Sequence, residues 1–394
     1  MTGSARRMRP GFSKGWKSLI GLIGGGRTTA GPPVLSGAKD AVWPVSVLVV
    51  RGDAHERGVQ HGETLRDSIA GYLATEMGRK ARALAKAERQ LDRLLDTVKS
   101  LARGDELLEE MRGIADGSGQ PFKTIAALNL GPTLDAEEGC TSLVVPASRN
   151  GPMLINTLDL VAKERDEARW HVLHVSHPTQ GRASIHLGHA GAVWAWRGIN
   201  DAGLATGASS GGPGRNRARY DGLFTFLTTR YALQFAEETD ELVDMLRTRP
   251  TVFKATNVST VDAEGRAAIV EHSSSAVGVR RSPNGQPIFA ANCFLSDVHA
   301  PLPEKVAGTP YLRNAQARLS RLHGWATSDP IEDIDGARRM VRDTNGGRPG
   351  QICQDNEVMY TICASIWLSS RREVIFYPDH PTRCAPWRLS LEPR

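Results

Sequence analysis

The sequence predicts an α+β protein in which long helices come first and a body rich in β-strands follows. Residues 63–117 carry apolar side chains at spacings of three and four, which is the period of an amphipathic helix. From residue 140 onward the pattern changes to short runs of β-branched and apolar residues. Because helices and strands do not alternate at the short period of a βαβ unit, we expect mostly antiparallel sheets flanked by helical layers.

The individual elements follow from local signals. An edge strand is expected before the helices, at residues 45–51, and the glycines at 117 and 119 are expected to end the last helix of the first region. A further helix is expected over residues 222–248, with Asp240 placed to cap its second half. Four strands are expected between these helical regions, at residues 141–145, 153–160, 171–176 and 183–187.

The last third of the chain alternates between strands and helices. Residues 257–261 and 267–271 flank a turn-forming segment and predict a β-hairpin. Later strands are expected at residues 288–294, 360–368 and 373–377, and helices near 310–323 and 331–342.

The net charge of +6 belongs to the beginning of the chain. Of 49 basic and 43 acidic residues, seven basic and one acidic lie in residues 1–42, so the remainder is neutral. A neutral body lacks the sustained basic face that nucleic-acid binding requires, and we expect no nucleic-acid partner. Residues 1–42 read as a basic flexible tail, whose apolar stretch at 19–23 is too short to span a membrane.

Cysteine usage indicates a reducing compartment. Five cysteines without CxxC spacing form neither a disulfide framework nor a zinc site, so we expect no metal and no cofactor. A secretory signal would need a continuous apolar core and a clear cleavage site, which the first residues lack. We therefore expect a cytoplasmic protein.

Cys140 is the candidate nucleophile, because it follows Gly139 directly and begins the strand-rich region. If its thiol cuts the Gly139–Cys140 bond, the new chain start carries a thiol and an α-amine on one residue. An α-amine has a pKa of about 7.7–8.0, so it accepts the thiol proton at physiological pH. On this segment alone, a small buried hydrophobic cysteine remains the alternative interpretation.

Several motifs together resemble one family. Residues His55-Glu-Arg-Gly-Val-Gln-His-Gly62 are similar to the N-terminal motif of the penicillin acyltransferase family of N-terminal nucleophile (Ntn) hydrolases. The resemblance covers about residues 45–380. Its other motifs, in the family's order, are Glu110-Met-Arg-Gly-Ile-Ala-Asp-Gly117, Ala127-Leu-Asn129, Gly139-Cys140-Thr141, Asn156-Thr-Leu-Asp159, the segment 198–205, Asn292-Cys293 and Ile352-Cys353.

The resemblance implies a four-layer αββα Ntn-hydrolase sandwich and an inactive precursor. The precursor would cut itself into a mainly helical α chain, residues 43–139 behind the tail, and a β chain, residues 140–394, which stay together as an α/β heterodimer. Cys140 would then form an acyl-enzyme with a small acyl amide, a peptide-like substrate or a thioester.

The resemblance also assigns roles to other residues. Asp159 would hold and polarise the new terminal amine, and a carboxylate within the apolar run 153–161 is costly to bury without such a partner. Asn292 would donate to the oxyanion, and Thr141 and Ser209 would contact substrate. Gly139 suits the position before the scissile bond, because a residue without a Cβ adopts a strained backbone conformation at lower cost.

The chain departs from the family's pattern at two places. Ser209 stands where the family has an asparagine, and Met359-Tyr-Thr361 replaces an expected arginine. Both places lie where substrate would bind, so a penicillin-type substrate does not carry over. Two alternatives stay open: an unprocessed papain-like amidase with Cys140 served by a histidine, and a non-catalytic scaffold that captures a ligand.

Overall fold

The computed structural model describes residues 45–79, 81–131, 138–212, 221–249, 251, 255–299, 301 and 304–392. The predicted basic tail, residues 1–42, lies outside this part of the chain.

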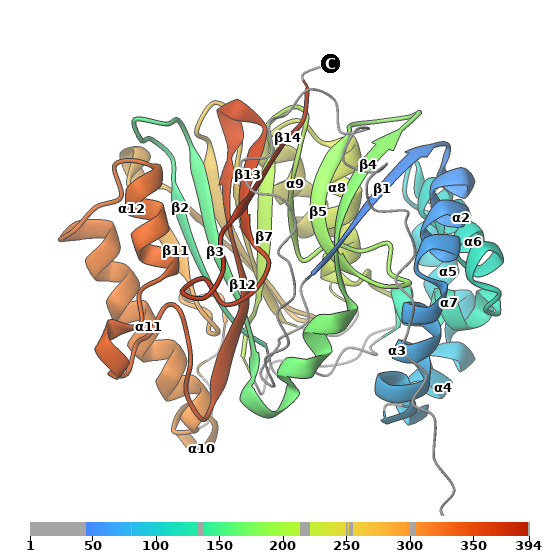
Figure 1. The fold of residues 1–394 in the computed structure, drawn as a ribbon, viewed down its shortest axis with the longest axis horizontal. Coiled ribbons are helices and arrows are strands. Elements are labelled where there is room, and N and C mark those ends of the chain that lie inside the picture. Colours follow the sequence, from blue (N-terminus) through green and yellow to red (C-terminus); the bar gives the residue numbers. More distant parts are fainter. Residues whose placement is uncertain are drawn as a thin grey trace, which may run out of the picture.

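Two β-sheets face one another at the centre of the molecule (Figure 1). The larger has the strand order β1 (Ser46–Gly52), β4 (His171–Pro178), β5 (Ser184–His189), β6 (Arg197–Asn200), β7 (Ala205–Ser210), β8 (Thr256–Val261), β9 (Ala267–His272) and β10 (Val277–Arg281). The smaller has the order β11 (Ile288–Ala290), β2 (Glu138–Val145), β3 (Met153–Val161), β12 (Met359–Leu368), β13 (Glu373–Tyr377) and β14 (Trp387–Ser390). All the pairings are antiparallel except that of β1 with β4.

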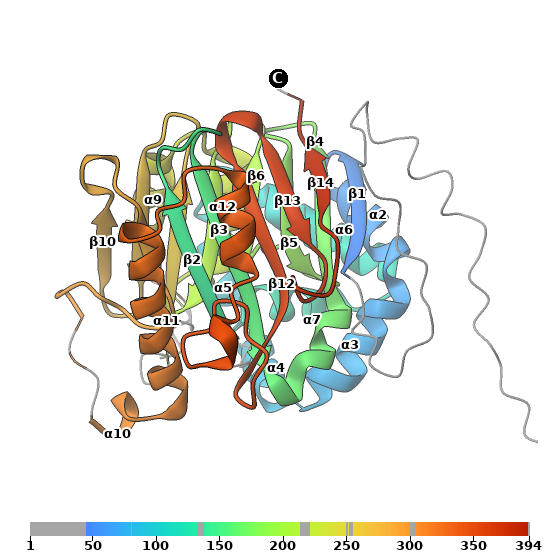
Figure 2. The ribbon, with the colours of Figure 1, turned by 60° about the vertical axis from the view of Figure 1, so that its left-hand side comes forward.

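Helices cover the outer face of each sheet, which makes four layers in the order αββα (Figures 1 and 2). The smaller sheet is covered by α11 (Pro310–Thr327) and α12 (Ile334–Val341), and the short helix α10 (Glu304–Ala307) packs against α11. The larger is covered by α8 (Thr225–Phe235), α9 (Thr239–Arg247) and the N-terminal helices α2 (Ala54–Thr64), α3 (Arg66–Arg79), α4 (Ala81–Arg89), α5 (Leu91–Lys99), α6 (Gly104–Ser118) and α7 (Phe122–Leu130). This is the predicted Ntn-hydrolase sandwich.

Glycines let α2 and α6 pack with their backbones in contact. A Cβ on Gly58 would lie 2.2 Å from a carbonyl oxygen of α6, and one on Gly113 would lie 2.2 Å from the carbonyl oxygen of His55. Gly62 and Gly117 meet the opposite helix in the same way, one turn further along. The glycines of the two N-terminal motifs therefore form a helix–helix interface.

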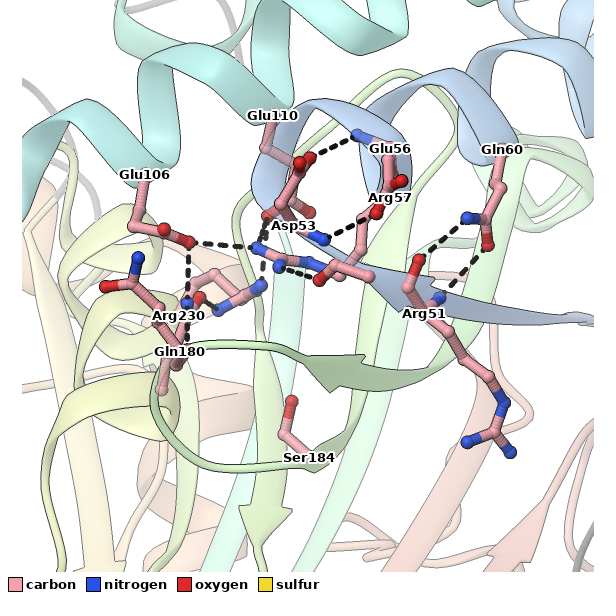
Figure 3. A network of polar contacts seen from close by, with 12 residues as sticks. Arg51, Asp53, Glu56, Arg57, Gln60, Glu106, Glu110, Gln180, Ser184 and Arg230 are labelled. Atoms are coloured by element: carbon pink, nitrogen blue, oxygen red, sulfur yellow. Dashed lines mark hydrogen bonds and ion pairs between the residues drawn. The ribbon is translucent and has the colours of Figure 1, made fainter.

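A buried ion network fixes these two helices to the rest of the protein (Figure 3). Glu110 of α6 accepts from Arg57 of α2 at 2.9 Å and from Arg230 of α8 at 3.2 Å. Burial raises the pKa of Glu110, but the charges of Arg230 and Arg57 outweigh it and hold the pKa below its usual value. Breaking such a pair leaves an uncompensated buried charge, so the network ties three helices together.

The remaining polar residues of the first motif are also structural. The side-chain amide of Gln60 makes two hydrogen bonds to the backbone of Arg51 on edge strand β1, at 2.7 and 3.0 Å (Figure 3). The Gly191 N–H donates to Nε2 of His61 at 2.9 Å, which requires an unprotonated nitrogen there. Burial lowers the pKa of His61 to about 4, so the ring is neutral at physiological pH.

Most predicted elements are confirmed, with differences at their ends. The helical region begins at Ala54 rather than 63, because Asp53 and Glu56 form a capping box that starts α2. The single helix predicted over 222–248 is two helices, α8 and α9. The expected cap at Asp240 is wrong: Glu238 caps α9, and Asp240 pairs with Arg281. Gly119, at φ 72°, ends α6 as predicted.

Short elements escaped the sequence analysis. Helix α7 and the strands β6, β10 and β14 were not expected, since each is brief or lacks a clean apolar period. The predicted strand at 288–294 ends at Ala290. Within the described residues, the helices are all too short or too polar to cross a bilayer.

The glycine interface makes a stability prediction. Gly113→Ala should lower the free energy of unfolding by about 1–3 kcal/mol, because the new methyl group meets backbone that cannot move aside cheaply. Gly324→Ala is the matched control, since nothing lies within 4 Å of a Cβ on that helical glycine, and it should leave stability unchanged or raised. Urea unfolding followed by circular dichroism measures both, and equal midpoints would contradict the interface.

Candidate active site

Strand pairing sets the position of Cys140. In the β2–β3 ladder, Gly139 lies opposite Asp159 and Cys140 opposite Leu158. Because side chains alternate along a strand, the Cys140 side chain points inward, between the two sheets, where it is 1% exposed. Arg197 of β6, in the facing sheet, donates from Nη2 to the Cys140 Sγ across 3.8 Å.

Asn292 meets the backbone of Cys140. Strand β11 pairs with β2 as far as Ala290 opposite Ser142, so the ladder would next bring residue 292 opposite residue 140. Strand β11 ends before that position, and the Asn292 side chain replaces the backbone pairing. Its Oδ1 accepts the Cys140 N–H at 3.1 Å, and its Nδ2 donates to the Ser210 carbonyl at 3.1 Å. The two residues are far apart in sequence and the fold brings them together.

A buried arginine that the sequence analysis did not single out joins these groups. Arg318 of α11 donates from Nη1 to the Cys140 carbonyl at 2.7 Å and to the Thr141 Oγ1 at 3.0 Å, and from Nη2 to the Asn292 Oδ1. Its Nε donates to Asn314 at 2.9 Å. Arg318 is fully buried, so it is held by these acceptors rather than by solvent.

A sequence signal for Arg318 did exist. The buried positions of α11 recur at spacings of three and four, and Arg318 occupies one of them. A charged residue on the apolar face of a helix needs partners inside the protein. The spacing therefore indicated that the Arg318 guanidinium is buried, but it did not indicate which groups the guanidinium contacts.

Asp159 lies on the other face of β3 from the space between the sheets. It is fully buried and accepts from the Thr361 Oγ1 at 2.6 Å, from the Gln354 Nε2 at 2.6 Å and from the Thr157 Oγ1 at 3.4 Å. Burial raises the pKa of Asp159, and the Arg318 charge and the three hydrogen bonds only partly oppose that rise. The carboxylate thus lies across the ladder from Gly139, next to the bond predicted to be cut.

The other predicted residues lie around this centre. The Ser209 hydroxyl donates to the Ala291 carbonyl at 3.4 Å, beside Asn257, whose Nδ2 donates to the same oxygen at 2.8 Å. Gly139 is in extended strand and is not among the described glycines with positive φ, so the expected backbone strain has no support at its φ. A Cβ there would instead meet the Met359 Sδ at 3.0 Å.

The family follows from a comparison with known families. A family model described as acyl-coenzyme A:6-aminopenicillanic acid acyl-transferase matches residues 148–383, more than half of the chain. The chain belongs to this family. The match begins after Cys140 and contains Asp159, Ser209 and Asn292. The family is described as one of acyl-transferases.

Solved structures show more distant similarity, and no curated protein sequence matches the chain. A mutant conjugated bile acid hydrolase from Clostridium perfringens is 12% identical with a TM-score of 0.41, over 61% of this chain and 89% of that one. An N-acylethanolamine-hydrolyzing acid amidase ortholog from Caenorhabditis elegans is 15% identical with a TM-score of 0.39, over 64% and 100%. Penicillin V acylase from Agrobacterium tumefaciens is 13% identical with a TM-score of 0.34, over 60% and 82%.

The donor set at the centre is one of thiol, amide, hydroxyl and guanidinium groups with a single carboxylate. Within the described part of the chain, no three His, Cys, Asp or Glu side chains gather as a metal site would need.

Arg318 should be essential to the stability of the centre. Arg318→Met removes the buried guanidinium that donates to the Cys140 carbonyl and is one of two donors to the Asn292 Oδ1, so we expect a loss of about 2–4 kcal/mol in the free energy of unfolding. Arg321→Met, one turn further along α11, removes an ion pair in which Arg321 is 42% exposed and Asp343 is 7% exposed. Asp343 keeps its hydrogen bonds from Trp325 and the Asn345 N–H, so the change should cost about 1 kcal/mol or less. Denaturant unfolding of the two variants gives the comparison, and similar losses in both would contradict the role of Arg318.

Proposed function

We propose that the protein is an autoprocessed cysteine Ntn enzyme, which cuts its own Gly139–Cys140 bond and then hydrolyses or transfers the acyl group of a small amide or thioester. The main support is the position of Cys140. It lies in strand β2, where Asn292 accepts its backbone N–H while its thiol points between the sheets.

In the proposed self-cleavage, the Cys140 sulfur attacks the Gly139 carbonyl carbon. The C–N bond breaks as the amide nitrogen takes up the proton that left the thiol, which gives a Gly139 thioester and a free α-amine on Cys140. Water then hydrolyses the thioester to the Gly139 carboxylate and restores the thiol. Asp159, across the ladder from Gly139, is the proposed partner of the new amine.

In the mature enzyme, the α-amine of Cys140 accepts the thiol proton and the thiolate attacks the substrate carbonyl. The Asn292 side-chain amide is the proposed donor to the oxyanion, a contact typically worth about 3 kcal/mol of barrier. The leaving amine takes the proton back from the ammonium group. Water or an amine then resolves the acyl-enzyme, with Ser209 proposed to line the substrate side. The Thr141 hydroxyl, which was also expected to contact substrate, accepts from Arg318 on the other side of the smaller sheet from the Cys140 thiol.

The proposed α and β chains have contacts that would hold them together as a heterodimer. Glu110, in the α segment, pairs with Arg230 of the β segment, and both are buried. Asn129, near the end of the α segment, donates to the Gly191 carbonyl at 3.0 Å and accepts the Val193 N–H at 2.7 Å. Cutting after Gly139 leaves all three contacts in place.

A cysteine–histidine pair does occur in the protein, but away from Cys140. The Cys353 Sγ lies 3.4 Å from the His380 Nε2, and both side chains are buried. Burial raises the pKa of the Cys353 thiol and lowers that of His380, so both shifts oppose the thiolate–imidazolium pair of a papain-like enzyme. A structural role for this pair fits better.

Intact-mass measurement tests self-cleavage. The wild-type protein should give two chains that end at Gly139 and begin at Cys140, whereas Cys140→Ala should give one uncut chain of about 42.7 kDa without turnover. Cys353→Ala is the matched control and should still be cut and active. An uncut wild type that turns over substrate would favour the papain-like alternative, and full function in Cys140→Ala would favour the non-catalytic scaffold.

The pH profile tests the role of Asp159. The carboxylate form is needed to hold the amine, and the raised pKa means that it is protonated at a higher pH than an ordinary aspartate, which titrates near 3.9. The rate of turnover should therefore fall on the acid side with an apparent pKa above that value. Asp159→Asn should lower the rate and abolish this acid limb, and an unchanged limb in the variant would assign it to another group.

A further inference from the structure

Arg197 differs from the other arginines that are fully buried in the described part of the chain. Arg57, Arg230 and Arg318 each donate to carboxylate, amide or carbonyl oxygens. Arg197 is equally buried, but among the described residues its Nε and Nη1 have no hydrogen-bond partner, and the acceptor of its Nη2 is the Cys140 sulfur at 3.8 Å. Burying a guanidinium without an oxygen acceptor costs free energy of folding. The buried position of Arg197 therefore indicates a ligand that binds reversibly and supplies the acceptor.

The groups that face Arg197 do not neutralise it. Cys363 of β12 is buried, and burial raises its pKa to about 12, so its thiol is uncharged. Burial lowers the pKa of His171 on β4 well below its usual value, and the charges of His189 and Arg197 lower it further, so that ring is uncharged too. Its Nδ1 also has no hydrogen-bond partner within the part of the chain that the structure describes. Asp159 lies on the other face of the smaller sheet, where Arg318 opposes its charge.

We propose that Arg197 binds a carboxylate of the substrate, and that the substrate is an N-acyl amino acid whose amide is cut by Cys140. This inference rests on the proposed function. The planar fork of a guanidinium matches the two oxygens of a carboxylate, and either edge of the fork includes the Nη2 atom that lies beside Sγ.

The distance from Arg197 to the Cys140 sulfur limits how far the substrate carboxylate can lie from the amide that is cut. The attacked carbonyl carbon must come within about 3–3.5 Å of Sγ, and Nη2 is 3.8 Å from the same sulfur. An anion on Arg197 therefore lies a few bonds from the scissile amide. The α-carboxylate of an N-acyl amino acid is separated from that carbonyl carbon by only the amide nitrogen and Cα, whereas the phosphates of coenzyme A lie at the far end of a long arm.

The experiment compares carboxylates with their neutral amides. The N-hexanoyl derivatives of glycine, alanine and phenylalanine, their C-terminal carboxamides and hexanoyl-coenzyme A are offered to the wild-type enzyme, with acyl-enzyme mass and kcat/KM as readouts. We expect a preference for at least one carboxylate over its carboxamide of about 100-fold or more, because the carboxamide leaves the buried guanidinium unpaired.

Arg197→Met should reduce this preference to within about threefold while the chain still cuts itself. The variant should fold, because an apolar residue of similar length replaces an unpaired buried charge. Arg197→Lys keeps the charge without the fork and should recover part of the preference. Thermal unfolding and intact mass of each variant separate a binding role from a structural one.

Several results would overturn the carboxylate site. These are equal rates for carboxylate and carboxamide in every wild-type pair, an acyl-enzyme from hexanoyl-coenzyme A alone, no acyl-enzyme from any N-hexanoyl amino acid, and an undiminished preference in Arg197→Met. If Arg197 serves only the thiolate, Arg197→Met should slow both substrate types equally and shift the pH profile of Cys140 alkylation by iodoacetamide. If the wild-type protein cuts itself but shows one of these results, only the carboxylate site is contradicted. If the wild-type protein is active without being cut, the proposed function is contradicted as well.

Discussion

The pairing of β2 with β3 is the constraint on which the site depends. The register places Gly139 opposite Asp159, and the alternation of side chains then determines which groups lie on each face of the sheet. A slip of one residue would bring Cys140 opposite Asp159 and put both side chains on the same face of the sheet, so the thiol and the carboxylate would no longer be separated. Helix α11 reinforces the register, because Arg318 binds the Cys140 carbonyl and the Thr141 hydroxyl.

The two faces of the smaller sheet provide different environments on either side of residue 140. On the helix side, Asp159 and Arg318 are held in a network of hydroxyl and amide groups. On the inner side, Cys140 faces Arg197 across the gap between the sheets, in surroundings that are mainly apolar. The backbone of one residue therefore connects the groups that would hold an amine with the space in which an acyl group would bind.

Sequence patterns predicted the layers better than they predicted the centre. Periodicity and turn residues identify long elements, and the motifs in register identified the family that the comparison then matched. The positions of Asn292 and Arg318 depend on where a strand ends and on how a helix packs, and neither is a local property of the sequence. Arg197 was missed because a charged residue in a four-residue strand resembles an exposed one until the opposite sheet is in place.

The N-terminal motif shows a different limit. Its spacing identified it as a feature of the family, but nothing in the sequence indicated the role of its glycines. Gly58 and Gly62 have meaning only against Gly113 and Gly117, some fifty residues later. Such a pairing requires the helix crossing, which local propensity does not specify.

The central claim is that residue 140 becomes a chain terminus whose thiol and amine act together. Reaction with 2-cyanobenzothiazole, which condenses with a cysteine that carries both a free thiol and a free α-amine, tests this most directly. The account predicts stoichiometric labelling of active wild-type protein, mapped by peptide mass to Cys140 at the start of the large chain, with loss of turnover. Fully active protein that takes up no label at Cys140 would contradict it.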